Sequence, residues 1–352
     1  MRKQRVRADI RTLKKVLIVR TDRIGDVVLS LPVAAALRRA NPHLTITMMV
    51  QPYVRNLVEN HDAVDEVLLD EGIPGLSGLF RMVKWIRKGR YDAALLLHPT
   101  PRLALIAFLA SIPLRIGTAY RFYSLLFNIR IHEHRKVSLR HEAEYNLTLA
   151  GAIGADPDHV ELSLPADKAA ARSLDRKLSA LGLHDRQRFV ILHPGSLRSA
   201  LDWPLGRFTQ LAKQLAKGAN RSILVTGSAV ETESAEIVSR AAGEKGFALA
   251  GKLDLSELTE LLRRADLLIA NSTGPLHMAV AAGSEVIGLF PPVRSMSPRR
   301  WGPYGRQEST LVPEGVCPKC TKEKCRRFNC MDEISVESVY TLAVRKLSMN
   351  ED

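Results

Sequence analysis

A set of small polar residues follows a buried apolar run in the C-terminal half of the chain. The run Leu267–Ala270 is typical of a parallel strand, and Asn271–Gly274 (N-S-T-G) follows it, ahead of Pro275. Pro275 favours the first turn of a helix, Gly283 would end that helix, and Glu285–Phe290 would return to the sheet. Such a loop directs backbone N–H groups and the positive end of a helix dipole at a ligand, which suits phosphate. An ordinary helix cap is the alternative.

Two further loops repeat this composition. His193-Pro194-Gly195-Ser196 and Thr226-Gly227-Ser228 each follow an apolar run. Because the carboxyl ends of parallel strands meet at one edge, three such loops predict a site for a diphosphate-bearing ligand. His277 lies about one turn into the helix, either within reach of that ligand or as a satisfied helical histidine. The chain lacks a G-x-G-x-x-G fingerprint, which argues against a dinucleotide dehydrogenase.

Asp26 carries a second kind of chemistry. It follows Arg20, Arg23 and Gly25 in the first expected strand-to-helix loop. A carboxylate at a helix N-terminus, flanked by arginines, is expected to have a depressed pKa and to stay ionised. It could then take a proton from a substrate hydroxyl as that oxygen attacks. The alternative is that Asp26 only caps the helix.

All four cysteines lie in one short segment, Cys317-x2-Cys320-x4-Cys325-x4-Cys330. Disulfides are disfavoured in the cytosol, so a tight cluster of thiolates is better interpreted as a metal site. Four thiolates would enclose zinc or iron and leave no position for substrate, which predicts a structural role. Four unmetallated surface thiols are the alternative.

The elements that must position these residues alternate between strand and helix, the signature of a doubly wound α/β sheet. Expected strands in the first half are 16–20, 44–50, 66–69 and 91–97, and expected helices are 27–40, 53–60, 79–88, 102–111 and 141–151. From Ile116 the pattern blurs, and after a connection at 154–168 the alternation restarts. We expect a Rossmann-like domain at 1–165, a second Rossmann-like domain at 166–332 that holds the diphosphate-bearing ligand and includes the cysteine segment 317–330, and a helix and tail at 333–352. Ligands of this architecture bind at the carboxyl ends of the strands, here in a cleft between two facing domains.

Composition limits the class of protein. The 352 residues contain no run near the roughly 20 apolar residues that span a bilayer. The basic first residues lack an apolar signal-peptide core, which predicts a cytoplasmic protein, peripheral at the inner face of the cell membrane. The net charge of +14 favours an anionic partner: a phosphorylated glycolipid, an anionic membrane or nucleic acid. Nucleic acid is disfavoured because aromatic residues are few and Arg121-Phe122-Tyr123 is the only clear basic and aromatic cluster.

Three blocks together resemble a known family. They are R-T-D-R-I-G-D-V-V-L-S-L-P at 20–32, H-P-G-S at 193–196 with W-P-L-G-R-F at 203–208, and S-T-G-P-L-H at 272–277. This order resembles the glycosyltransferase family 9 heptosyltransferases of lipopolysaccharide synthesis, which have the GT-B architecture of two facing Rossmann-like domains. The resemblance implies an inverting transfer of heptose from a nucleotide-heptose, usually ADP-heptose, to a lipopolysaccharide core or related bacterial glycan. It implies Asp26 as the general base and no catalytic metal.

The resemblance also implies the binding residues. Thr273, Gly274 and His277 would hold the donor diphosphate, and Trp203 with Pro204 would shape the donor side. The full expected donor set is His193, Gly195, Ser196, Arg198, Trp203, Thr226, Gly227, Ser228, Ser272, Thr273, Gly274, Pro275 and His277. The candidate acceptor contacts are Arg20, Arg23, Gly25 and Arg121.

The chain departs from the family pattern in three places. Ser272 stands where an acidic residue often precedes the threonine, and Leu201-Asp202 replaces a lysine that usually precedes W-P, so that Arg198 would substitute for it. The third departure is the cysteine cluster, which is similar to the metal finger of heptosyltransferases that modify autotransporter proteins. Transfer to protein serines is therefore a second interpretation. A nucleotide-sugar-binding protein without transfer activity is a third.

Overall fold

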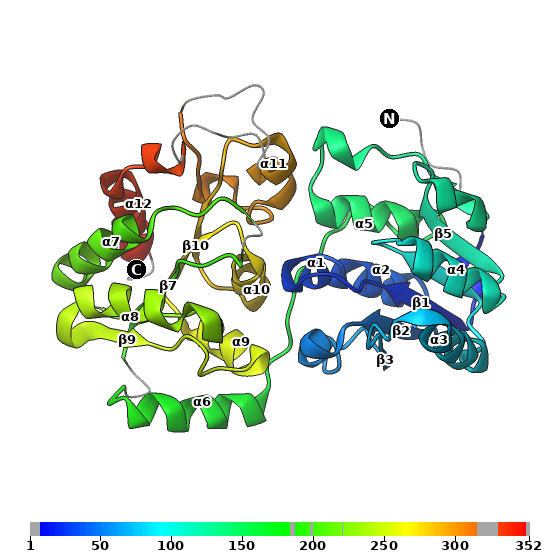
Figure 1. The fold of residues 1–352 in the computed structure, drawn as a ribbon, viewed down its shortest axis with the longest axis horizontal. Helices are drawn as coiled ribbons and strands as arrows, with labels where there is room; N and C mark the ends of the chain where they lie inside the picture. The colour runs from blue at the N-terminus through cyan, green and yellow to red at the C-terminus, as the bar shows by residue number, and fades with distance from the viewer. Residues whose placement is uncertain (1–7, 184–186, 198–199, 220, 315–329, 350–352) are drawn as a thin grey trace. The chain divides into compact units, whose positions relative to one another are not determined.

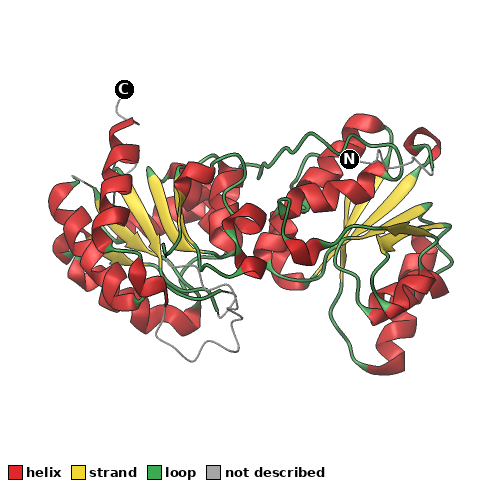
Figure 2. Cartoon of the chain, turned by 90° about the horizontal axis from the view of Figure 1, so that it is seen from above, coloured by secondary structure: helices red, strands yellow, loops and turns green. Residues whose placement is uncertain are grey.

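The computed structural model describes residues 8–183, 187–197, 200–219, 221–314 and 330–349. The chain divides into two compact units: Met1–Lys136 with Arg140–Pro165, and Val137–Leu139 with Ala166–Asp352. Each unit is built on one six-stranded sheet. Figure 2 shows the strands of each sheet, in yellow, enclosed between helices in red.

The N-terminal unit has the strand order β3-β2-β1-β4-β5-β6, and all its pairings are parallel. Its strands are β1 Lys15–Val19, β2 Thr45–Val50, β3 Glu66–Leu69, β4 Ala93–Leu96, β5 Leu114–Thr118 and β6 Ile129–Ile131. The order reverses between β1 and β4. In an open parallel sheet, ligands bind outside the carboxyl ends of the strands at such a point.

Helices cover both faces of this sheet (Figure 1). They are η1 Ile10–Thr12, α1 Ile24–Val28, α2 Leu31–Ala40, η2 Pro52–Leu57, α3 Gly75–Gly89, α4 Pro101–Leu109, η3 Phe122–Leu126, η4 Arg135–Val137 and α5 Glu142–Gly151. Because side chains alternate along a strand, Leu17 and Val19 pack in one core with α3, α4 and η3. Val16 and Ile18 are buried on the opposite face.

The helix expected at 27–40 is two helices. It begins earlier, at Ile24, ends after Val28, and restarts at Leu31 with Pro32 in the first turn of α2. Pro32 has no backbone N–H to donate, so it is tolerated only near a helix start. The interruption leaves the buried Leu29 carbonyl available to accept a hydrogen bond from Asn146 Nδ2, at 3.0 Å. The segment expected as a helix at 53–60 is the 3-10 helix η2.

The C-terminal unit has the order β12-β11-β10-β7-β8-β9, again parallel throughout. Its strands are β7 Phe189–His193, β8 Ser222–Val225, β9 Gly246–Ala248, β10 Leu267–Asn271, β11 Val286–Leu289 and β12 Thr310–Leu311. Its helices are α6 Lys168–Ala180, α7 Leu205–Gly218, η5 Ala229–Glu231, α8 Thr232–Ala241, η6 Gly243–Lys245, α9 Leu255–Arg264, α10 Gly274–Ala282, η7 Arg294–Met296, α11 Pro298–Trp301, η8 Gln307–Ser309, η9 Cys330–Glu333 and α12 Val336–Met349.

The unit of strand, loop, helix and strand expected at 267–290 is present as β10, α10 and β11. Pro275 lies in the first turn of α10, and Gly283 ends it in the left-handed conformation, with φ of 90°. Both roles were predicted from residue type. The predicted α/β class with two doubly wound parallel sheets is confirmed. No helix of the described residues is long and apolar enough to span a bilayer.

Candidate active site

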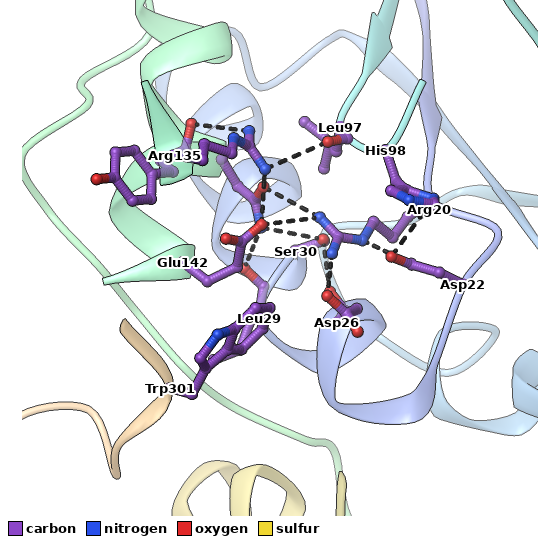
Figure 3. A network of polar contacts seen from close by, with 12 residues as sticks. Arg20, Asp22, Asp26, Leu29, Ser30, Leu97, His98, Arg135, Glu142 and Trp301 are labelled. Carbon is purple, nitrogen blue, oxygen red and sulfur yellow. Dashed lines mark hydrogen bonds and ion pairs between the residues drawn. The ribbon is translucent and has the colours of Figure 1, made fainter. Parts of the chain in front are cut away.

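Arg20 is the centre of a buried ionic network at the carboxyl end of β1. Its side chain is 2% exposed. Nε donates to Asp22 at 2.7 Å, Nη2 donates to Asp26, and Nη1 donates to Asn146 at 3.2 Å, with Glu142 3.4 Å away. Figure 3 shows the guanidinium between Asp22, Asp26 and Glu142. One cation therefore holds three carboxylates, two from its own loop and one from α5.

Asp26 lies in the first turn of α1, and its side chain is 17% exposed. Burial raises the pKa of Asp26 to about 6; Arg20 opposes this shift, and the nearby Asp22 and Glu142 charges add to it. The depressed pKa predicted from the helix terminus was therefore wrong in direction. Arg20 lowers the pKa as expected, but desolvation and two like charges outweigh it. A carboxyl group with this pKa is well matched to proton transfer near neutral pH.

Arg20 was expected to contact an acceptor, and the structure gives it a different place. Burial alone would lower the pKa of Arg20, but Asp26, Asp22 and Glu142 raise it above its ordinary value, so it stays charged. Its nitrogens are directed at protein oxygens inside the unit. Arg20 therefore positions Asp26. Arg23 and Arg121 are exposed, and Gly25 is buried in α1.

The network contains residues that sequence reasoning missed. Arg135 Nη1 donates to Glu142 at 2.6 Å and to Asn146 at 3.2 Å, so that Glu142 is shared between two arginines. His98 follows β4, and its Nδ1 lies 3.6 Å from Asp22. Burial lowers the pKa of His98. The only signal in the sequence was an acidic residue in the first turn of the expected helix 141–151, which is also ordinary dipole chemistry.

The three loops of the C-terminal unit follow β10, β7 and β8, which are neighbours in the sheet. His193 Nδ1 lies 2.9 Å from Thr226 Oγ1, which joins two of these loops. Burial lowers the pKa of His193 to about 4, although Glu231 opposes the shift. His193 is therefore neutral near pH 7. It shares a hydrogen bond with Thr226 and supplies no positive charge.

Gly195 allows a carboxylate to approach the backbone of its loop. A Cβ at Gly195 would lie 1.7 Å from Glu231 Oε1, so no larger residue fits without displacing that side chain. Glu231 Oε2 accepts from the backbone N–H of Ser228 at 2.8 Å and from its hydroxyl at 2.7 Å. Gly227 is also close to Glu231, with a built Cβ 3.2 Å from Glu231 Cβ. No pattern in the sequence singled out Glu231.

Asn271, part of the expected N-S-T-G loop but not of the expected donor set, links the third loop to the first. Its Oδ1 accepts from the Trp203 backbone N–H at 2.9 Å, and its Nδ2 donates to the Pro194 carbonyl at 2.6 Å. The Trp203 indole is 1% exposed, packs edge-on against Phe208, and donates to the Ile334 carbonyl at 2.9 Å. Trp203 therefore shapes this edge through its backbone and the core, because its ring is turned inward.

The start of α10 presents the remaining expected donor contacts. Thr273 is the N-cap residue, with extended backbone and no side-chain capping bond, and Gly274 begins the helix. Ser272 is half-buried, Ser196 and His277 are buried, and Pro275 is in the first turn. In the described parts of the three loops, 194–197, 200–204, 226–231 and 271–274, there is no Lys or Arg. The groups that these described residues offer a phosphate are backbone N–H groups, hydroxyls and the N-terminus of α10.

Several expected residues lie outside the described part of the chain. They are Arg198 and the first three cysteines, Cys317, Cys320 and Cys325; Cys330 begins η9. Among the described residues, no group of three or more His, Cys, Asp and Glu side chains is placed to hold a metal ion.

The fold is α/β, with two doubly wound parallel sheets whose candidate residues lie in loops at the carboxyl ends of the strands. The family model for glycosyltransferase family 9 (heptosyltransferase) matches residues 79–330. The chain therefore belongs to glycosyltransferase family 9, and it is a glycosyltransferase of the heptosyltransferase type.

Known proteins agree with this assignment. A Haemophilus influenzae protein with a provisional glycosyltransferase name is 29% identical over 318 residues, which cover 88% of this chain and 91% of that protein. Lipopolysaccharide heptosyltransferase 2 of Salmonella typhimurium is 26% identical and covers 79% of this chain and 83% of its own length. The structure of the Escherichia coli ADP-heptose lipopolysaccharide heptosyltransferase II has the same fold. Its TM-score is 0.79 at 20% identity, over 96% of this chain and 100% of that one.

Proposed function

We propose that this enzyme transfers heptose from ADP-heptose to a lipopolysaccharide-type glycan acceptor, with inversion, and that Asp26 is the general base. The observation that carries the proposal is the carboxyl group of Asp26 at the edge of the first sheet, with a pKa of about 6. Family membership and the names of the relatives, which specify ADP-heptose and lipopolysaccharide, support the donor and acceptor classes.

The proposed reaction is a single displacement at the anomeric carbon of the donor sugar. An acceptor hydroxyl oxygen attacks the anomeric carbon, the bond from that carbon to the phosphate oxygen breaks, and ADP leaves with the electron pair. The hydroxyl proton passes to Asp26. A single displacement of this kind inverts the anomeric centre and needs a base on one side and a stabilised leaving phosphate on the other.

Each edge supplies one of these needs. Arg20 orients the Asp26 carboxylate, while burial, Asp22 and Glu142 keep that carboxylate basic enough to accept a proton. Charge on the departing diphosphate would be stabilised by the small-residue loops and by the N-terminus of α10, which begins at Gly274. The exposed Arg23 and Arg121 remain candidate contacts for an acidic acceptor.

The test is transfer from ADP-heptose to a truncated lipopolysaccharide core, with the wild type compared with Asp26→Asn. Asn keeps the shape of the side chain but cannot accept the proton, so we expect kcat to fall about 10²- to 10⁴-fold. The thermal stabilisation by ADP should be unchanged, since donor binding involves the other unit. Equal turnover in both proteins would exclude Asp26 as the base. UDP or GDP stabilising the protein more than ADP would exclude the adenine donor.

A further inference from the structure

One surface of the N-terminal unit combines exposed aromatic side chains with unbalanced positive charge. Residues 75–131 contain nine Lys and Arg and a single acidic residue, Asp92. The rest of 1–165 is balanced, with fifteen basic and fifteen acidic residues. The net charge of this unit therefore comes entirely from the segment that forms α3, α4, η3 and the strands between them.

The same segment holds most of the exposed apolar side chains of the unit. The large hydrophobic residues at least 36% exposed in this segment are Leu76, Phe80, Trp85, Phe108, Tyr120, Phe122 and Leu125. In the described part of the C-terminal unit the exposed residues of this kind are aliphatic: Val137, Leu139, Leu197, Val230, Ile237, Val312, Val344 and Met349. Exposed aromatic rings are thus concentrated where the positive charge is concentrated.

Helix α3 shows the pattern most clearly. Its inner face, with Met82, Val83 and Ile86, packs on the sheet. Its outer face presents Leu76, 72% exposed, and Phe80, 59% exposed, which are four residues apart and so lie one above the other.

Cationic side chains continue this outer face. Lys84 and Lys88 are exposed and again four residues apart. Arg81 stacks on Trp85, with its guanidinium carbon 5.3 Å from the ring centroid, and is paired with Glu71, so the cationic part of the face is Lys84 and Lys88. The helix contains no acidic residue. Basic residues mixed with Phe, Trp and Leu are typical of helices that lie in the boundary between lipid headgroups and acyl chains.

We propose that the outer face of α3 is a docking surface for an anionic lipid bilayer. Leu76 and Phe80 enter the acyl boundary, and Lys84 and Lys88 meet acidic headgroups. A second copy of this chain fits the surface poorly, because two such faces would bring lysines together and interface cores are depleted of Lys. The role of this surface rests on the proposed function, because docking on a membrane would bring the enzyme to a lipid-linked acceptor.

The experiment is flotation of the full chain with vesicles, without donor or acceptor. Phosphatidylglycerol-containing vesicles should bind the wild type, pure phosphatidylcholine vesicles should bind it much less, and added salt should weaken the binding. The double variants Lys84→Glu with Lys88→Glu and Leu76→Gln with Phe80→Gln should each lower the bound fraction about tenfold or more.

Matched controls come from the other unit. Lys213 and Lys217 are exposed on α7 at the same spacing as Lys84 and Lys88, and Ile237 is 42% exposed on α8. Lys213→Glu with Lys217→Glu, and Ile237→Gln, should bind vesicles like the wild type. Binding lost equally in these controls would overturn the proposal. Vesicle binding that Leu76→Gln with Phe80→Gln leaves unchanged would also overturn the proposal. The same holds if the α3 variants alter only self-association or oligonucleotide binding and not vesicle binding.

The same variants separate this inference from the proposed function. Transfer to a soluble core oligosaccharide should persist in all of them, because none of the altered residues belongs to the candidate active site. Transfer with no vesicle binding by the wild type would remove the docking surface and leave the enzyme assignment intact. Vesicle binding by the wild type without transfer would support the docking surface and count against the proposed reaction.

Discussion

The carboxyl ends of the two sheets carry different kinds of groups. In the N-terminal unit they carry the Arg20 network, which we call the ionic edge. In the C-terminal unit they carry the loops after β7, β8 and β10, which we call the small-residue edge. At the edge of the first sheet a guanidinium that is 2% exposed holds three carboxylates, and the carboxyl group expected to react has a pKa of about 6. At the edge of the second sheet the described residues of the loops, which leave out 198 and 199, include no Lys or Arg; their histidine is neutral, and glycine and asparagine allow close backbone contacts. Neighbouring charges and burial set the pKa of a general base. A phosphate site instead needs backbone N–H groups that the ligand can reach.

Arg20→Met tests the ionic edge and should have the largest effect. Without the guanidinium, Asp22, Asp26 and Glu142 are like charges around a buried site, so we expect the free energy of unfolding to fall by about 3–5 kcal/mol. Denaturant unfolding followed by circular dichroism measures this change. Arg23→Met, an exposed change in the same loop, should stay within about 0.5 kcal/mol of the wild type.

If Arg20→Met does not fold, Arg20→Lys can be used in its place, because lysine keeps the charge but cannot reach all the partners of Arg20. The free energy of unfolding of Arg20→Lys should lie below that of Arg23→Met and above that expected for Arg20→Met. Stability of Arg20→Met equal to that of Arg23→Met would mean that the network does not hold this edge together.

Gly195→Ala tests the small-residue edge. The added Cβ would displace Glu231 from Ser228, which we expect to cost about 1–3 kcal/mol of stability and to weaken stabilisation by ADP. Gly206 is the matched control, because a Cβ there meets nothing within 4 Å. Thermal unfolding with and without ADP should separate the two variants. Gly206→Ala and Gly195→Ala behaving alike would count against a close-packed donor loop.

The pH dependence sharpens the contrast between the two edges. Because Asp26 must be ionised to act, kcat/KM should rise about tenfold per unit of pH until about pH 6 and then level off. The pKa of Asp26 is above its unfolded value, so the folded state binds more protons between about pH 4 and 6. The contribution of this group to stability therefore falls as pH rises through that window. Asp26→Asn should remove this part of the pH dependence, and an unchanged pH profile in that variant would point to another group.

Thr226→Val should have the smallest effect. It removes the hydroxyl 2.9 Å from His193 Nδ1 while keeping the shape, so we expect a loss of about 1 kcal/mol in the free energy of unfolding. Thr232→Val, at an exposed hydroxyl, should lie within about 0.5 kcal/mol of the wild type. A Thr226→Val variant as stable as this control would show that the bond between the two loops contributes little.

Most of the sheet could be predicted because buried parallel strands appear as apolar runs bounded by turn residues. The strand at Glu66–Leu69 was predicted to the residue. β5 was missed because Arg115 and Gly117 break its apolar pattern. Arg115 donates to the carbonyls of Ile112 and Leu126, at 2.5 Å and 2.8 Å. Gly117 leaves room for Phe127, whose ring would lie 2.5 Å from a Cβ there.

The sequence by itself determined which loops are candidates for the chemistry, since small residues after apolar runs and an aspartate after a strand are local patterns. It also determined the helix start at Pro275 and the helix end at Gly283, which depend on backbone geometry alone. Only the tertiary structure decided the pKa of Asp26 and the place of Arg20. Both depend on burial and on Glu142, which lies 122 residues from Arg20 in the chain and joins the network through packing of α5. Desolvation and long-range charge pairing are properties of the folded interior, and no local pattern contains them.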